Sequence, residues 1–226
     1  MTRDPLDAAI QASRRWYDDV FALHGISVRS DGELWTAVGD PPPWHSAAKT
    51  LARHVDADAV LAAMASHPHG SVADSFGTLD LGPHGFELLL DAEWLHHPGV
   101  ADATWPRRWS VVEDEGLLVE WCRRHDYAGV LPAATLARPE FRVLAVVAGG
   151  EPVAGAVVHD AGDVAGMSNL WSRGPAPTAA DVAEVLACAG VLHPGRPVTD
   201  YAWGDELDVL LAAGFTAVGP QRVWAR

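Results

Sequence analysis

The stretch from Phe141 to Ser172 reads FRVLAVVAGG, EPVAGAVVHDAG and DVAGMSNLWS, and it decides the fold. Its three apolar runs have the length of strands, and Gly149-Gly150 and the DAGD segment at 160–163 divide them. Glycine and aspartate readily adopt the positive φ that tight hairpin turns require. The stretch therefore predicts a three-stranded antiparallel meander.

Residues 142–148 are apolar on both faces of the first strand, so we expect a covering layer on each side of the sheet. Helical and strand patterns then alternate up to Arg226. Thr178 and Asp181 form a capping box for a helix that we expect to end at Gly190. A strand at 198–202, a helix at 206–213 and a final strand after Gly214-Phe215 complete the series. This order predicts an α/β fold with a mixed central sheet flanked by helices.

The first hundred residues carry a second set of signals. A helix begins after Asp4 and Pro5, and another begins after Asp56. Strand patterns occupy 26–28, 34–38, 71–76 and 86–94, and the run Pro41–Pro43 stops regular pairing. We expect an N-terminal α/β half over residues 1–104 and a core over residues 105–226, which meet near the segment 97–102.

Composition narrows the class of protein. Apolar residues make up 49% of the 226 residues, which allows a sizeable core. The formal charge of -14 disfavours nucleic acid and favours a cationic partner. No apolar run approaches the ~20 residues of a membrane span, so we expect a cytoplasmic monomer or homodimer without membrane contact. Cys122 and Cys188 are far apart in sequence, and we interpret both as reduced and structural.

The element order strand, helix, meander, helix, strand, helix, strand, closing on AAGFTAVGPQRVW at 212–224, resembles the GNAT acetyltransferase superfamily. The Gly214-Phe215 pair is the most recognisable part of a resemblance that covers about residues 105–226. The N-terminal half resembles a partial, degenerate second copy. The resemblance implies acetyl-CoA or another acyl-CoA as co-substrate and an amine as acceptor. It also implies a wedge between the strands at 164–171 and 198–202, where donor and acceptor meet.

The resemblance assigns candidate residues to two roles. In such proteins a Q/R-x-x-G-x-G/A loop cradles the pyrophosphate with free N–H groups at a helix start. Here Arg173 matches the first position, the glycines of the pattern are missing, and Pro175 and Pro177 remove two donors. The cofactor-binding candidates are Leu170, Ser172, Arg173, Gly174, Thr178 and Ala179, with Thr178 and Ala179 supplying free N–H groups.

The catalytic candidates are Ser168, Asp200 and Tyr201, polar residues in strands beside the implied wedge. Leu210 occupies the place where many members of the superfamily have a proton-donating tyrosine. A bulge bonded to its own backbone is the competing interpretation of Ser168-Asn169. His159, beside Asp160, is expected as a solvated residue at a strand end. His67-x-His69 and His96-His97 lack metal-ligand spacing, so we expect no metal.

Two functions remain open from the sequence. The first is an acyltransferase that moves an acyl group from acyl-CoA to the amine of a small molecule or peptide. The second is a catalytically inactive binding or regulatory module, which the prolines of the phosphate loop and Leu210 favour. A ligand cleft formed between the two halves is a third interpretation.

Overall fold

One sheet organises the protein in the computed structural model, which describes residues 4–226. Its eleven strands over these residues follow the order β1-β2-β3-β4-β11-β5-β10-β9-β8-β7-β6. Neighbouring strands are antiparallel except for the parallel pairs β3–β4 and β9–β10. The strands are β1 Ser27–Ser30, β2 Leu34–Val38, β3 Ala48–Thr50, β4 Ser71–Asp74, β5 Glu87–His97, β6 Trp109–Val111, β7 Phe141–Ala148, β8 Glu151–Asp160, β9 Ala165–Ser172, β10 Val198–Ala202 and β11 Thr216–Ala225.

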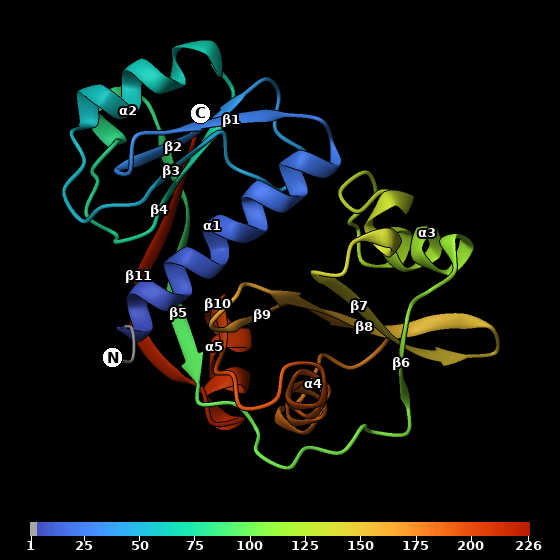
Figure 1. Ribbon diagram of the computed structural model, residues 1–226. Coiled ribbons are helices and arrows are strands. Elements are labelled where there is room, and N and C mark those ends of the chain that lie inside the picture. The colour runs from blue at the N-terminus through green and yellow to red at the C-terminus, as the bar shows by residue number, and fades with distance from the viewer. Residues whose placement is uncertain (1–3) are drawn as a thin grey trace.

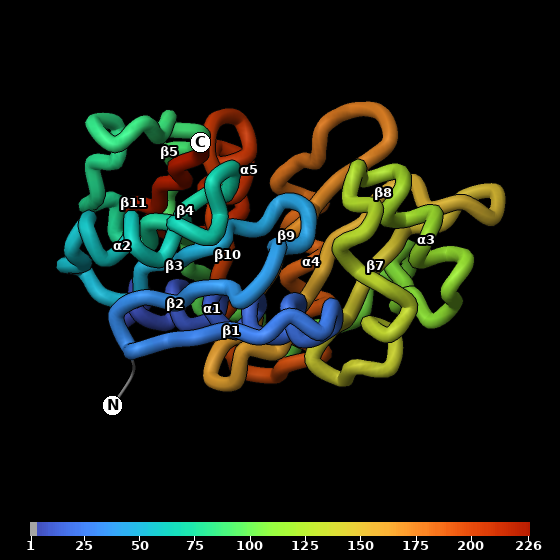
Figure 2. The backbone as a smooth tube through the Cα atoms, turned by 90° about the horizontal axis from the view of Figure 1, so that it is seen from above, coloured from blue at the N-terminus to red at the C-terminus, as the bar shows by residue number. Residues whose placement is uncertain are grey.

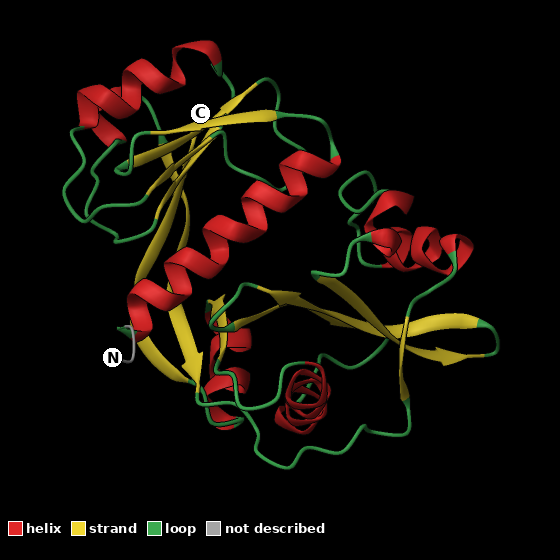
Figure 3. Ribbon diagram, in the orientation of Figure 1, coloured by secondary structure: helices red, strands yellow, loops and turns green. Residues whose placement is uncertain are grey.

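Helices cover both faces of this sheet (Figures 1 and 3). The long helix α1 runs across one face and contacts β1, β11, β5, β10 and β9, and α3 packs on β8. Helices α4 and α5 contact each other and lie on β9 and β10. The helices are α1 Pro5–Leu23, α2 Ala57–Ala63, α3 Glu115–Arg124, α4 Ala179–Leu192 and α5 Gly204–Ala212, with short 3-10 turns at Met64–Ser66, Gly82–His84 and Ala133–Ala137. No helix within 4–226 combines the length and apolar character needed to cross a bilayer.

The predicted meander is present as β7, β8 and β9. Side chains of β7 alternate between two cores, as expected for a strand that is covered on both faces. Leu144 joins the core beneath α4 and α5, whereas Val143 and Ala145 join the core beneath α3. The prediction of a mixed α/β sheet flanked by helices is therefore confirmed.

Local capping signals identified the helix starts correctly. Asp4 Oδ1 accepts a hydrogen bond of 2.8 Å from the Leu6 amide, and Pro5 opens α1. Asp56 caps α2, and the capping box of Thr178 and Asp181 opens α4. These caps satisfy N–H groups that a helix start otherwise leaves without partners.

One strand was not predicted, and the end of one helix was placed wrongly. The strand β3 follows the proline run, although its three residues Ala48–Thr50 show no alternation of polar and apolar side chains. Helix α4 passes through Gly190 and ends at Leu192. Gly190 instead allows a close approach, since a Cβ atom there would lie 2.8 Å from the Val100 carbonyl oxygen and 2.7 Å from Ala103 Cβ.

The strand β11 joins the two predicted halves. It comes from the end of the described chain, yet it lies between β4 and β5 and pairs antiparallel with both (Figure 2). On the other side of β5 lies β10, and all five residues of β10 pair with β5. Both halves thus contribute strands to one continuous sheet, and the boundary near residue 104 stays a prediction.

Lys49, the only lysine of the sequence, lies in β3 with none of its surface exposed. Its Nζ has no hydrogen-bond partner among the residues that the structure describes. The ammonium lies over two aromatic rings, 5.2 Å from the Tyr17 centroid and 5.0 Å from the Trp94 centroid. Burial lowers the pKa of Lys49 to about 7, although the Asp74 carboxylate opposes that shift.

Replacing this amine by Lys49→Met should stabilise the protein at neutral pH. The unfolded lysine keeps its proton up to about 10.5, whereas the folded one loses it near pH 7. Because the unfolded state binds more protons in that window, wild-type stability rises with pH from about 7 to about 10.5. The variant lacks this rise, and its gain at pH 7 should be on the order of a few kcal/mol in urea unfolding.

The titration itself is directly measurable, because ¹⁵N-lysine labelling gives a single side-chain signal in this protein. An Nζ that titrates near its ordinary value of 10.5, together with equal stability of the methionine variant, would contradict the prediction.

Candidate functional site

The parallel pairing of β9 with β10 is short. Only Val198 with Ala165 and Thr199 with Gly166 are paired, after which the two strands diverge. β10 continues along β5 up to Ala202, so it is β9 that turns away from it. A wedge between these strands is therefore present, as the sequence resemblance implied.

A bulge in β9 accompanies this divergence. Ala156 of β8 faces both Asn169 and Leu170, because the register shifts between Gly155 and Val157. Asn169 has φ 57°, a left-handed conformation that asparagine tolerates better than most residues. Bulges redirect side chains at functional sites. The bulge expected as the competing interpretation of Ser168-Asn169 thus exists, and both residues also line a cavity.

The cavity, of about 280 Å³, lies where β9 and β10 separate. Its wall is formed by residues of α1, β5, β8, β9, β10 and the start of α5, and by the segments around residues 44–45 and 125–127. Asp200 and Glu206 are its only charged side chains apart from histidines, within the described part of the chain. Its aromatic wall includes Trp16, Tyr17, Trp44, Trp94, Tyr127 and Trp203. Such a cavity suits a small ligand with an apolar body and a positive charge.

The three catalytic candidates Ser168, Asp200 and Tyr201 all line this cavity. Neighbouring residues of a strand point to opposite faces, so Asp200 and Tyr201 reach one cavity only because the sheet opens there. The Tyr201 ring packs edge-on against Trp94, with 5.6 Å between centroids. Burial raises the pKa of Asp200 well above its usual value, and the nearby Glu206 carboxylate adds to this effect. Partial desolvation in the cavity also raises the pKa values of Glu206 and Tyr201, although 37% of the Tyr201 surface is exposed.

Hydrogen bonds fix several polar groups of the wall. Asn169 donates through Nδ2 to Ser168 Oγ at 2.8 Å and accepts at Oδ1 from His125 Nε2 at 3.0 Å. Trp16 Nε1 donates to His45 Nε2 at 3.0 Å, while His45 Nδ1 donates to the Pro43 carbonyl at 2.9 Å. Burial lowers the pKa of His45 to about 4, so this imidazole is neutral at neutral pH. The wall is thus preorganised around Ser168.

A second hollow, also of about 280 Å³, lies on the other stretch of β9, and Leu170 lines both hollows. Four of the cofactor-binding candidates line it, and Gly174 and Ala179 lie outside the lining. Those four are Leu170, Ser172, Arg173 and Thr178. The Arg173 side chain is 64% exposed and has a long contact of 3.5 Å to Glu151, so its guanidinium is available to an anion.

The start of α4 offers fewer donors than expected. The Thr178 amide was predicted to be free, but it donates to Asp181 Oδ2 at 2.8 Å as part of the capping box. Ser172 Oγ donates to the Pro175 carbonyl. Arg108 pairs with both Asp181 and Glu184, which neutralises these carboxylates near the helix start. An anion at this end would depend mainly on Arg173 and on the amides after Thr178.

The prediction that His159 is solvated at a strand end was wrong. Its side chain is 2% exposed, because α1 covers the end of β8 and Asp19 of α1 binds the imidazole. No local pattern signals this contact, which joins residues 140 positions apart in the sequence. Glu206 and Trp203 were also missed, although they follow the Asp200 strand directly. No group of three or more His, Cys, Asp or Glu within residues 4–226 is arranged to hold a metal ion.

Asp200→Asn should raise thermal stability at neutral pH. The unfolded carboxyl loses its proton near 3.8, whereas burial keeps the folded one protonated to higher pH. This contribution is therefore favourable below about 3.8 and is lost as pH rises toward the raised folded pKa. Melting curves should show a gain for the variant that is larger at neutral than at acidic pH. Asp208→Asn, on an exposed carboxylate of α5, is the control, and an equal response of both variants would refute the buried-charge explanation.

Several solved structures share this architecture. A GCN5-related N-acetyltransferase from Kribbella flavida superposes with a TM-score of 0.65 at 15% identity, covering 96% of this chain and 95% of the other. A GNAT-family protein from Novosphingobium aromaticivorans gives 0.64 at 13% identity, covering 98% and 97%. A GCN5-related N-acetyltransferase from Sphaerobacter thermophilus gives 0.56 at 10% identity, covering 98% and 93%. No protein-family model and no curated protein sequence matches the chain. At these identities the likeness concerns the fold, and the chain has the fold of the GNAT acetyltransferase superfamily.

Proposed function

We propose that this protein transfers an acetyl or other acyl group from acyl-CoA to the amine of a small molecule or peptide. One observation carries the proposal: Leu170 of β9 lines both the cavity and the second hollow, in the part of β9 that has already left β10. A thioester that lay along β9 would enter the cavity at its reacting end. Donor and acceptor would then meet in a closed space without a covalent enzyme intermediate.

The hollow along β9 supports the acyl-CoA part of the proposal. It runs past Ser172 and Arg173 to the start of α4, and a pantetheine arm is long and narrow enough to follow it. Arg173 would contact the phosphates with its exposed guanidinium. Because Thr178 and Asp181 bind each other, the phosphates would contribute less to affinity than the arm and the acyl group.

The cavity wall favours a cationic amine as the acceptor. A bound ammonium group would favour the ionised forms of Asp200 and Glu206 and so offset the rise in their pKa values. The faces of aromatic rings such as Trp16 and Trp203 would stabilise the ammonium further. The formal charge of -14 also attracts cations to the molecule as a whole. A volume of about 280 Å³ fits a small amine or a single side chain of a peptide.

The catalytic candidates would act on the reacting atoms. Ser168, held by Asn169, is a hydroxyl donor for the oxyanion of the tetrahedral intermediate. Tyr201 keeps its proton because burial raises its pKa, and it would donate to the departing thiolate. Leu210 cannot donate this proton, because its side chain is apolar and is buried in the core beneath α4 and α5.

The inactive binding module remains the second candidate. The observation that favours it is the occupied start of α4, where the capping box uses the Thr178 amide and places the Asp181 carboxylate beside the phosphate position. A module of this kind would still bind amines in the cavity but would bind no acyl-CoA.

The two cysteines support the predicted cytoplasmic location. Cys122 and Cys188 are both free and buried, and they belong to different cores. Burial raises their thiol pKa values to about 11 and about 12, which makes them poor nucleophiles. Free buried thiols suit a reducing compartment.

Calorimetric titration with acetyl-CoA tests the proposal. We expect binding, and a ligand at ~100 times its Kd should stabilise the protein by about 2.7 kcal/mol in a thermal-shift assay. Arg173→Ala should lower the affinity for acetyl-CoA by about 3- to 10-fold, because one exposed charged contact is lost. It should leave acetyl-pantetheine, which lacks the nucleotide phosphates, unaffected.

Arg123→Ala is the matched control, since the side chains of Arg123 and Arg173 are each 64% exposed. An equal loss in both variants would show a general charge effect rather than a phosphate contact. Absence of binding by acetyl-CoA and by longer acyl-CoAs would replace the proposed transfer with the binding module.

A further inference from the structure

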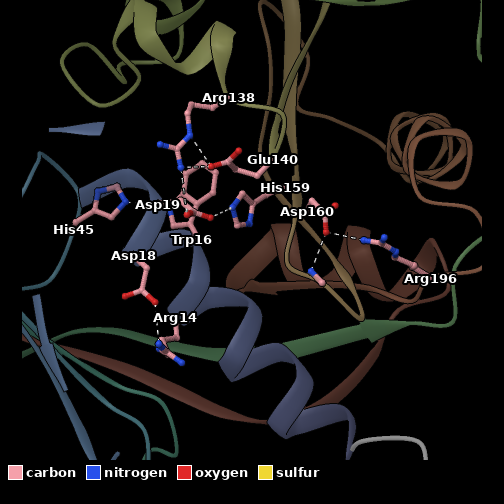
Figure 4. Close-up of polar contacts among 11 residues, drawn as sticks. Arg14, Trp16, Asp18, Asp19, His45, Arg138, Glu140, His159, Asp160 and Arg196 are labelled. Atoms are coloured by element: carbon pink, nitrogen blue, oxygen red, sulfur yellow. Dashed lines mark hydrogen bonds and ion pairs between the residues drawn. The ribbon is translucent and has the colours of Figure 1, made fainter. Parts of the chain in front are cut away.

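An aspartate–histidine pair lies at the closed end of the wedge (Figure 4). His159 of β8 faces Gly166, the residue of β9 that pairs with Thr199 before the strands diverge. His159 lines the cavity, and its Nε2 lies 2.9 Å from Oδ2 of Asp19 on α1. The remaining nitrogen, Nδ1, is buried and has no hydrogen-bond partner among the residues described.

The contact with Asp19 decides which imidazole nitrogen carries the proton. A carboxylate oxygen accepts hydrogen bonds, so Nε2 holds the hydrogen and Nδ1 keeps a free lone pair. Trp16 packs edge-on against the His159 ring, with 5.4 Å between the ring centroids. The Phe141 ring centroid lies 5.0 Å from that of His159. These contacts fix the ring orientation and leave Nδ1 as an acceptor.

The surroundings of Asp19 favour this arrangement. Arg138 lies 3.8 Å from Asp19 Oδ1 and is itself bound by Glu140. The neighbouring Asp18 serves the other half of the sheet, where its Oδ1 accepts from Trp35 Nε1 at 2.7 Å. The two successive carboxylates of α1 thus have different partners, and only Asp19 binds a residue of the cavity wall (Figure 4).

A purely structural histidine would be expected to have both nitrogens satisfied, because buried polar atoms without partners are unfavourable. We propose that His159, oriented by Asp19, accepts the proton of the acceptor amine at Nδ1, directly or through one water molecule. This inference rests on the proposed acyl transfer and names the base for it.

The proposed step balances as follows. The bound ammonium gives one proton to His159 Nδ1, which becomes an imidazolium beside the Asp19 carboxylate. The neutral amine then forms the N–C bond to the thioester carbonyl, and the C–S bond breaks. Tyr201 gives its proton to the thiolate sulfur and takes up the second amine proton in return, and His159 returns its proton to solvent. Asp200 and Glu206 hold the ammonium before transfer, and His159 removes its proton.

Nuclear magnetic resonance of ¹⁵N-histidine-labelled protein tests the geometry without relying on turnover. We expect His159 with a protonated Nε2 and an unprotonated Nδ1, and we expect benzylammonium to shift the Nδ1 signal. In Asp19→Asn the amide NH₂ would donate to Nε2, which moves the proton to Nδ1. Asp18→Asn is the matched control on the same helix and should leave both signals unchanged.

Kinetics with acetyl-CoA and benzylamine tests the role. General-base loss typically costs about 10²–10⁴-fold in rate, so His159→Gln and Asp19→Asn should lower kcat by that factor with little change in the KM for acetyl-CoA. Added imidazole should restore part of the activity of His159→Ala, which a merely structural role would not allow. Circular dichroism of each variant checks that it is folded.

The outcomes separate the two proposals. An active wild type with an equally active His159→Gln would overturn the base assignment and leave acyl transfer intact. An inactive wild type that binds no acyl-CoA would overturn the proposed function. In that case, a His159 signal with a protonated Nδ1, or one that benzylammonium does not shift, would overturn the contact with the amine as well.

Discussion

The two residue pairs that join β9 to β10 are the constraint on which the candidate site depends. Had the pairing continued past Thr199, the sheet would be closed and Asp200 and Tyr201 would point to opposite, separately covered faces. β9 instead diverges from β10 after Gly166, and the bulge at Asn169 lies in the diverging part of β9. The backbone geometry therefore creates the cavity, and the side chains then give it its aromatic and acidic character.

Two ionisable groups at or near the cavity, Asp200 and Lys49, are poorly solvated. Trp94 contacts the Lys49 ammonium with its ring and also packs against Tyr201 of the cavity wall. Asp200 faces the cavity, and burial disfavours its charged form as it disfavours that of Lys49. Each group lowers stability at neutral pH by the same physical cause. Such costs are expected where a site rather than the core determines the residue type.

Local signals in the sequence were sufficient for most elements and for part of the site. The hairpin glycines and the caps at Asp4, Asp56 and Thr178 act within a few residues, so they could be recognised without coordinates. The position of Ser168 beside the wedge followed from a resemblance in element order. The capping box predicted from Thr178 and Asp181 already implied that the Thr178 amide is used within the helix start, so the assignment of this amide as a free donor conflicted with that prediction.

Long-range contacts were beyond such signals. β3 is a strand because β2 and β4 flank it, and nothing in its three residues indicates that. Asp19 and His159 meet through the packing of α1 on the sheet, which no spacing in the sequence encodes. The placement of β11 between β4 and β5 is another long-range contact that could not be predicted from local patterns. It also affects the order of folding, since residues 98–215 separate β5 from its partner in the chain. The edges of β4 and β5 must stay open until that partner has been synthesised, so the N-terminal half can complete its sheet only after the rest of the chain has been made.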